Sequence, residues 1–378
     1  GATVSTGGSL SIKPFEPVGP RAQSYGYGWG IDTWSTGNWG EAASASSVSL
    51  EPGLWSLSNF GEVLIATVAN GKTFTWNAGA GSPLTTRAST TTSNFQTGNN
   101  PTATRVTLVS PTTRHLIHLG TETTIGTTST QDDMFIRFSD QENINSYTPT
   151  ATNTAGTQRL ADGSQIRGAI RGRDAIYVWT DTALFTQRFV GQPFTFAFSQ
   201  VGTNCGLVGQ NACVEVDGAA YWMSENGFFR YAGKLESLPC LVEDHVYNDI
   251  NLESGNQMVS AGLNNLFGEV MWFYPTSSSS VVNRMVAYNY FDSSPQRPVW
   301  TVGTLARTMW QDSAVFGSPH ATEYDAANDS SFDVVGNTEG RTTYYQHETG
   351  TDQVKGGTVT AITANIASGD FDISQRRS

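Results

Sequence analysis

The stretch from Gly163 to Cys240 constrains the fold more than any other part of the chain. Within it, short apolar runs alternate with polar residues, and turn sequences at 172–174, 217–218 and 225–227 separate the runs. A period of two and glycine-containing turns predict β-hairpins, and the stretch has no helical period. We therefore expect two successive antiparallel units of similar layout. Consecutive four-stranded units of about 40–50 residues are typical of a β-propeller.

Similar hairpin units continue on both sides of this stretch. A single unit leaves an apolar face exposed, and radial stacking of successive units buries that face. The chain is therefore predicted to be all-β, a β-propeller of about six blades of antiparallel strands, with tandem β-sandwiches as the alternative. Helix is expected only near Val242–Asn248. The units are Leu54–Trp76, Arg105–Tyr147, Ile166–Phe198, Ala212–Leu238, Met258–Trp300 and Trp310–Gln346.

Three regions of different character are expected along the chain. Residues 1–50 alternate glycine with aromatic residues and hold few aliphatic ones, which predicts an extended N-terminal arm whose rings dock on a neighbouring surface. An ordinary loop-rich start to the first domain is the alternative. Residues 51–350 are assigned to the propeller. Residues 351–378 begin a new strand pattern, which predicts a C-terminal strand that closes the ring or pairs with a neighbour.

The charge of the chain limits the partners it can hold. Its formal net charge is −12, and charged residues make up 14% of the sequence. A protein that grips duplex DNA through its phosphates is normally strongly basic, so sequence-specific DNA binding is not expected. An acidic surface is compatible with a passage along which DNA slides, because repulsion prevents sticking. The apolar runs fall short of the roughly 18–20 residues of a membrane span, so membrane insertion is not expected.

The sequence lacks the familiar catalytic motifs. It has no G-x-S-x-G elbow, no H-E-x-x-H pattern, no phosphate-binding Gly-Lys loop and no dinucleotide fingerprint. His115 and His118 lie in an apolar strand, and their odd spacing places them on opposite faces, which argues against a shared metal ion. Cys205, Cys213 and Cys240 match no zinc or disulfide pattern and are predicted to be buried thiols in strands.

Paired carboxylates are the remaining catalytic candidates, because a propeller glycosidase needs two of them about 5–10 Å apart. Most of the acidic residues flank turns, where capping and solvation are the simpler role. The segment Ser139–Asn143 resembles a sialidase Asp-box but lacks its glycine and tryptophan. Asp325, Asp329 and Asp333 are spaced unlike the ligands of a calcium loop. The other carboxylates considered are Asp140, Asp174, Asp181, Glu215, Asp217 and Glu269.

Aromatic and basic clusters also have a simple structural interpretation. The aromatic residues at 221–222, 272–274 and 288–291 have side chains that stack on sugars, but packing between blades is favoured. Four arginines share one hairpin unit, and solvated strand ends are favoured over contacts with a neighbour's acidic surface or a DNA phosphate. No catalytic, cofactor-binding or metal-binding residue and no cofactor is therefore predicted, and the protein is not expected to be an enzyme. The arginines are Arg167, Arg171, Arg173 and Arg188.

Several segments resemble structural proteins of tailed bacteriophage virions. The resemblance runs over residues 24–373 and is densest between 135 and 251, and no catalytic signature lies within it. The segments that carry it are LWSLSNFGEVLIA (54–66), FIRFSDQENINSYTPT (135–150), AIYVWTDTALFTQRFVGQPFTFAFSQVGTNCGLVGQNA (175–212), YWMSENGFFRYAG (221–233), LPCLVEDHVYNDIN (238–251) and ASGDFDI (367–373).

This resemblance implies a tail nozzle or tail hub protein of the head-to-tail complex. Such proteins carry a β-propeller and assemble as a homo-oligomeric ring, commonly a hexamer, below the portal and adaptor. The implied role is to extend or close the DNA channel for genome retention and ejection, to pass DNA without sequence-specific binding, and to dock tail fibres. The implied location is the virion tail, after synthesis in the host cytoplasm. The alternative is a receptor-binding or glycan-degrading tail spike or fibre propeller. Chains of this kind usually continue past a strand like that at 370–373, so a shortened form or a fragment is expected.

Overall fold

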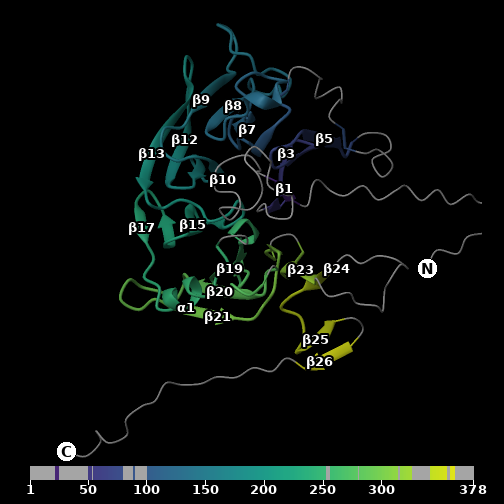
Figure 1. Ribbon diagram of the computed structural model, residues 1–378, viewed down its shortest axis with the longest axis vertical. Coiled ribbons are helices and arrows are strands. Elements are labelled where there is room, and N and C mark those ends of the chain that lie inside the picture. Colours follow the sequence, from purple (N-terminus) through teal and green to yellow (C-terminus); the bar gives the residue numbers. More distant parts are fainter. Residues whose placement is uncertain are drawn as a thin grey trace, which may run out of the picture.

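The chain forms a six-bladed β-propeller (Figure 1). The computed structural model describes residues 22–24, 50–52, 54–79, 88–89, 100–252, 256–279, 281–313, 316–325, 341–355 and 358–361. Within this part of the chain, six antiparallel sheets follow one another in a ring, and helix is nearly absent. The prediction of an all-β propeller is confirmed. The alternative of tandem sandwiches is wrong, because the innermost strands of consecutive sheets contact one another in sequence order round a common axis.

Each blade is a meander in which strands adjacent in sequence are adjacent in the sheet. Blades 2 to 5 have four strands and blades 1 and 6 have three. Blade 1 comprises β3 (Trp55–Phe60), β4 (Val63–Val68) and β5 (Thr73–Asn77). Blade 2 comprises β6 (Thr104–Val109), β7 (Leu116–Thr121), β8 (Phe135–Phe138) and β9 (Gly156–Arg159). Blade 3 comprises β10 (Ile166–Arg171), β11 (Ile176–Thr180), β12 (Ala183–Gly191) and β13 (Thr195–Thr203). Blade 4 comprises β14 (Cys213–Val216), β15 (Ala219–Ser224), β16 (Gly227–Tyr231) and β17 (Leu235–Ser237). Blade 5 comprises β18 (Ser260–Asn264), β19 (Glu269–Tyr274), β20 (Arg284–Asn289) and β21 (Trp300–Gly303). Blade 6 comprises β22 (Met309–Gln311), β23 (His320–Asp325) and β24 (Arg341–Gln346).

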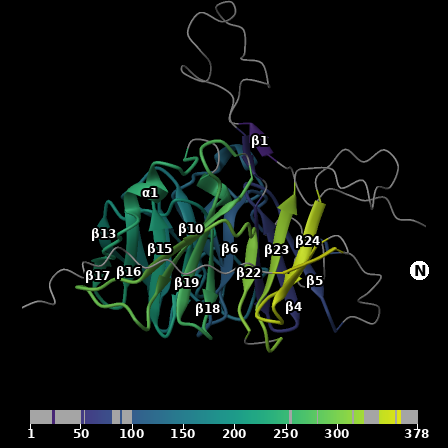
Figure 2. The same ribbon diagram turned by 90° about the horizontal axis from the view of Figure 1, so that it is seen from below.

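The two ends of the propeller differ in the connections they carry. We name the strands of each blade A to D from the innermost outward. Because all pairs are antiparallel, the AB and CD turns of every blade lie at one end, the AB–CD end, and the BC and DA connections lie at the other, the BC–DA end. The helix α1 (Glu243–Tyr247) joins blade 4 to blade 5 at the BC–DA end. The antiparallel pair of β1 (Ala22–Ser24) and β2 (Leu50–Pro52) stands on the same side of the disc as α1 (Figure 2).

The remaining elements are short. The 3-10 helix η1 (Thr128–Thr130) lies between β7 and β8, and η2 (Asn256–Met258) precedes β18. The helix predicted near residues 242–248 is confirmed as α1. The strands β25 (Asp352–Lys355) and β26 (Thr358–Ala361) pair with each other. No helix in the described residues has both the length and the apolar character needed to cross a membrane.

Two terminal predictions fall largely on residues outside the described ones. Of the predicted arm at 1–50, only β1 and the first residue of β2 are described. Of the predicted C-terminal strand at 351–378, β25 and β26 are described as a hairpin of their own, and residues 362–378 lie outside. The docking of the arm and the closure of the ring by the C-terminal strand therefore stay predictions.

The predicted hairpin units coincide with the blades because their turns carry local signals. Asp217 and Gly218 have φ values of +50° and +87°, and Val216 pairs with Ala219 across them. Positive φ at both central residues is the geometry that an Asp-Gly pair favours in a two-residue hairpin. One boundary differs from the sequence pattern. Blade 2 extends beyond Tyr147, the last residue of the predicted unit, and ends with β9. The sequence pattern misses β9 because its residues are mostly exposed and show no apolar alternation.

Apolar clusters lie between consecutive blades and form the core. The largest joins blades 3, 4 and 5, and smaller ones join blades 1 and 2, 2 and 3, and 5 and 6. Trp179, Trp222 and Trp272 occupy the B strands of blades 3, 4 and 5 and are fully buried. The Trp272 indole N–H donates to the Ala212 carbonyl at 3.0 Å, and that of Trp310 donates to the Leu263 carbonyl at 2.9 Å. These bonds satisfy buried donors and fix one blade against the next.

Gly262 lies where blade 5 packs closely against Trp310 of blade 6. A Cβ atom at this position would lie 2.7 Å from Cβ of Trp310, a distance that side chains do not tolerate. We expect Gly262→Ala to destabilise the fold by about 1–3 kcal/mol, because the stem of Trp310 cannot move aside without shifting its blade. Urea unfolding monitored by tryptophan fluorescence measures the change.

Gly303→Ala is the matched control for this substitution. The nearest atom to its added Cβ would be the flexible Met285 methyl at 3.3 Å. A glycine in a strand is weaker than alanine by roughly 0.5–1 kcal/mol, so this variant should be neutral or slightly more stable. Equal destabilisation of the two variants would contradict the role of the Gly262–Trp310 contact.

Candidate functional site

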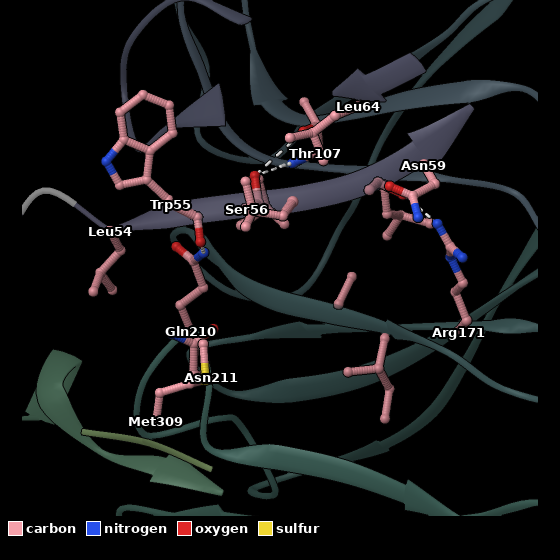
Figure 3. A pocket seen from close by; sticks show the side chains of 16 residues that line it. Leu54, Trp55, Ser56, Asn59, Leu64, Thr107, Arg171, Gln210, Asn211 and Met309 are labelled. Carbon is pink, nitrogen blue, oxygen red and sulfur yellow. Dashed lines mark hydrogen bonds between the residues drawn. The ribbon is translucent and has the colours of Figure 1, made fainter. Parts of the chain in front are cut away.

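A cavity lined by described residues lies in the central channel of the propeller and is shown in Figure 3. It encloses about 910 Å³, which is within the range of roughly 300–1,000 Å³ typical of ligand pockets. Its wall comes from the innermost strands of blades 1, 2, 3 and 6 and from the segment before blade 4. The residues that give it its chemical character are Leu57, Asn59, Arg171, Gln210, Asn211 and Met309.

Alternation along β3 produces one wall of the channel. Ser56 and Ser58 point towards blade 2, where their hydroxyls accept the backbone N–H groups of Thr107 and Val109, both at 3.0 Å. In a strand the intervening residue points to the opposite face. Leu57 therefore faces the channel and is 65% exposed. Together with Met309, which is 53% exposed, it gives the channel an apolar section.

Two side chains cross the channel to blade 1. At the end of β10, the Arg171 guanidinium donates a hydrogen bond to the Ser58 hydroxyl (Figure 3). Burial lowers the pKa of Arg171. No carboxylate among the described residues lies within 4.0 Å of it as an ion-pair partner. Nearer the other end, the Gln210 amide donates to the Trp55 carbonyl at 3.4 Å. These bonds tie blade 1 to the far side of the ring.

The lining of the channel suits binding better than acid–base chemistry. The described residues that line it include no aspartate, glutamate, histidine or cysteine. The one charged group in the lining is Arg171, and the rest are apolar side chains, hydroxyls and amides. General acid–base or nucleophilic catalysis needs a titratable or nucleophilic group next to a base, and the lining does not bring such groups together. An anionic or apolar group is what this wall can hold.

The described carboxylates singled out in the sequence are spread over five blades, and three of them hold loops together. Asp140 accepts the Thr154 hydroxyl at 2.6 Å and the Thr154 N–H at 2.8 Å. Asp181 accepts the Ser164 N–H at 2.8 Å, and Glu215 accepts the Gly218 N–H at 2.5 Å. Burial raises the pKa of Asp140, but the hydrogen bonds from Thr154 outweigh it, so the pKa is lowered overall. These contacts agree with the turn-forming role predicted for such residues.

The other acidic candidates are not brought together into a site either. Asp174 and Asp217 lie in exposed AB turns. Glu269 lies on β19, where burial and then the charge of Glu348 raise its pKa. Asp329 and Asp333 lie outside the described residues. That their segment does not form a calcium loop therefore stays a prediction. No group of three or more potential metal ligands occurs among the described residues.

The two histidines of blade 2 are buried and have separate hydrogen-bond partners. His115 contacts the hydroxyls of Thr113 at 2.7 Å and Thr154 at 3.0 Å. His118 contacts the Thr104 hydroxyl and the Tyr147 hydroxyl, both at 3.1 Å. Burial lowers the pKa of His115 to about 4, although the Asp140 charge opposes the shift. Burial, helped by the charge of Arg137, lowers that of His118 to about 3.

The cysteines and aromatic clusters mainly serve packing. Cys205 and Cys213 are buried and Cys240 is half-buried, and burial raises the pKa of Cys213 to about 12 and that of Cys240 to about 11. Of the three, Cys213 lies in a strand. Most of the aromatic residues favoured for packing are buried between blades, and Phe291 is the clear exception at 63% exposed. The buried ones are Tyr221, Trp222, Trp272, Phe273, Tyr274 and Tyr288.

The four arginines of blade 3 point in different directions. Arg167 is largely buried and approaches the Glu225 carboxylate at 3.9 Å. Arg171 is exposed at the end of β10 and lines the channel, and Arg173 and Arg188 are exposed as well. Solvation at strand ends therefore describes Arg173 and Arg188 fully, and Arg171 in part, because Arg171 also bonds to Ser58. The contact between Arg171 and Ser58 joins residues 113 positions apart, and no local pattern in the sequence signals it.

Comparison with known proteins finds only remote structural likeness. No family model matches the chain, and no curated protein matches it. Similar solved structures include the computationally designed Ika8 protein (8% identity, TM-score 0.39, covering 72% of this chain and 69% of that one). They also include BamB from Moraxella catarrhalis (10% identity, TM-score 0.33, 73% and 83%) and Hsv2 from Kluyvelomyces marxianus (10% identity, TM-score 0.36, 78% and 78%). At these values the likeness says nothing about function.

We expect Arg171→Ala to loosen blade 1 without unfolding the propeller. Loss of one hydrogen bond of about 1 kcal/mol should raise local opening of β3 about 5-fold. Hydrogen–deuterium exchange of peptides covering Trp55–Phe60 measures this opening. Arg173→Ala, at an exposed turn of the same blade, should leave the exchange of β3 unchanged. Equal rates for wild type and Arg171→Ala would show that the cross-channel contact does not hold blade 1.

Burial of His118 should make the protein less stable in mild acid. Its pKa is about 3 in the folded state and near 6.5 in the unfolded chain, so its contribution is complete above about pH 6.5 and is lost as the pH falls. Between pH 6.5 and 4.5, this histidine alone should lower the free energy of unfolding by about 1.4 kcal/mol per pH unit.

Urea unfolding at pH 7.5, 6.5, 5.5 and 4.5 measures that slope. His118→Gln should reduce the slope while lowering stability at pH 7.5, because the new side chain cannot match both hydroxyl partners. His245→Gln, at an exposed position of α1, is the control and should keep the wild-type slope. A slope unchanged in His118→Gln would contradict the assignment.

Proposed function

We propose that this protein is a non-enzymatic structural component of a bacteriophage tail, of the nozzle or hub type below the portal and adaptor. It assembles as a homo-oligomeric ring, of six copies in the arrangement implied by the sequence resemblance. The ring extends or closes the DNA channel during genome retention and ejection, and it docks tail fibres. The protein is made in the host cytoplasm, becomes part of the virion tail and does not insert into a membrane.

The chemistry of the channel supports this proposal best. Among the described residues, the channel wall places no carboxylate, histidine or cysteine beside its hydroxyl groups, and side chains from blade 3 and from the segment before blade 4 reach across it to blade 1. The acidic residues that most resembled catalytic candidates accept hydrogen bonds inside loops. Such a propeller offers rigid surfaces, which is what an assembly component requires. The segments that resemble virion proteins most densely, residues 135–251, build the outer strands β8 and β9 of blade 2, all of blades 3 and 4, and part of the connection to blade 5.

The contacts across the channel also constrain the path that DNA would take. The bonds from Arg171 and Gln210 to blade 1 leave no passage for a duplex, whose major groove alone is about 12 Å wide. DNA would therefore run along the axis of the ring of subunits, outside each propeller. A net charge of −12 suits a wall that DNA slides past, because few cations are present to hold its phosphates.

Electron microscopy of virions tests the proposal. We expect six-fold density on the tail axis, below the portal and adaptor, into which the propeller fits as a rigid body. An antibody against a tag on the purified chain provides a control for the assignment of that density. Density away from the tail axis, as in a fibre or spike, would contradict the proposal, and so would a stable monomer that cleaves a polysaccharide.

A further inference from the structure

Exposed apolar side chains gather at one end of the propeller. In blades 3, 5 and 6 they lie in or beside the AB and CD turns, so all of them belong to the AB–CD end. At the BC–DA end, the exposed large apolar residue of the described loops is Leu241, which is 77% exposed. Large exposed patches on one face mark interaction sites more often than scattered single residues do. The residues at the AB–CD end are Phe189, Val190, Phe194, Leu266, Phe267, Phe291 and Phe316.

The first group forms the tip of the hairpin β12–β13, which we call the blade 3 tip. Phe194 is 77% exposed, Val190 55% and Phe189 44%. Exposed Arg188 adjoins Phe189 on β12, and exposed Arg173 and Asp174 line a small pocket together with Phe189. None of these three charged residues takes part in an ion pair with another described residue. The tip is therefore apolar, and the charges beside it, two cations and one anion, are net positive.

The second group lies on blades 5 and 6, and we call it the blade 5–6 rim. It consists of Leu266, Phe267, Phe291 and Phe316, which are 50–63% exposed. The Asp312 carboxylate of blade 6 accepts the Asn265 N–H of blade 5 at 3.4 Å, so the turns of the two blades adjoin.

Carboxylates flank this rim. Asp292 follows Phe291 in the chain, Asp312 lies in the same AB loop as Phe316, and Glu348 accepts a hydrogen bond from Asn264 at 3.3 Å. One cation, Arg297, is exposed in the CD loop that holds Phe291 and Asp292. None of these four charged residues forms an ion pair with another described residue. The rim is therefore apolar, and the charges beside it, three anions and one cation, are net negative, opposite in sign to those of the blade 3 tip.

We infer that these two surfaces bind each other between copies of this chain, the blade 3 tip of one copy on the blade 5–6 rim of the next. Both are apolar, and the net charges beside them are opposite in sign, so contact between them buries apolar surface on both sides and brings opposite net charges together. Contact of either surface with its own copy would instead bring like net charges together. The inference rests on the proposed function, for which it names the subunit interface.

The positions of the two surfaces suit a head-to-tail ring. Blade 3, with β12 and β13, lies across the disc from blade 6, with β23 and β24 (Figure 1). A contact between two different surfaces repeats from copy to copy and closes into a ring when the rotation between copies allows it. A tip and a rim on opposite flanks leave each copy free to contact two neighbours at once.

Sedimentation velocity of the purified chain over a range of concentrations tests the interface. The wild type should form a discrete oligomer, and Phe194→Asp or Phe291→Asp should each weaken association at least about 10-fold, as loss of an interface anchor does. Leu241→Asp, an equally exposed change at the other end, should assemble as the wild type does. Circular dichroism and thermal unfolding confirm that all variants keep the fold.

A mixture of the two defective variants is the sharper test. Phe194→Asp keeps its rim and Phe291→Asp keeps its tip, so together they should form a one-to-one dimer and nothing larger. Each variant alone should stay monomeric. Absence of the mixed dimer, or assembly of Phe194→Asp at wild-type strength, would overturn the interface.

A wild type that stays monomeric up to about 100 µM, or that assembles only when another tail protein is added, would overturn it too. These results are distinguishable from failure of the proposed function. Six-fold density on the tail axis would still support the tail role through a different contact. An oligomer dependent on Phe194 and Phe291, in a protein that lies off the tail axis, would support the interface alone.

Discussion

Tryptophan packing between blades is the interaction on which the rest of this propeller depends. The sheets of blades 3, 4 and 5 each bury a tryptophan from the B strand, and the indoles of Trp272 and Trp310 donate to carbonyls of the preceding blade. A blade has two apolar faces and cannot bury both alone, so its neighbours complete it. The ring arrangement follows from this stacking. So do the choice of side chains in the core and the distances between the turns of different blades.

At the other side of the ring, hydroxyl groups replace the tryptophans. Between blades 1 and 2, the hydroxyls of Ser56, Thr107, Thr67 and Thr73 contact one another in a chain at 2.7–3.2 Å. Such bonds are directional and satisfy buried polar groups, but they bury little apolar surface. Blade 1 consequently depends on additional contacts, and the hydrogen bonds from Arg171 and Gln210 across the channel provide them. The threonine- and serine-rich character of the sequence has a structural use here.

The fold could be predicted from the sequence because its signals are local. Alternating strands and turns such as Asp217-Gly218 lie within a few residues of each other, so they locate the blades and the hairpin ends. The strand β9 was not predicted, because its mostly exposed residues show no alternation of apolar and polar side chains. The channel was not predicted either. Its wall joins Ser58 to Arg171 over 113 positions, and only the stacking of blades 1, 2 and 3 brings them together. Most of the carboxylates were predicted correctly as loop formers, because their partners are near in sequence.

In this propeller, the surfaces available for binding other molecules lie at the turns. Strands hold the buried residues, and loops on a rigid scaffold are free to vary and to bind. Because the stacked blades are rigid, the blade 3 tip and the blade 5–6 rim lie at a fixed separation and angle. In a head-to-tail assembly, that angle sets the rotation between copies and hence how many copies close the ring. The number of subunits would then be encoded in the packing of Trp222, Trp272 and Trp310, far from any interface.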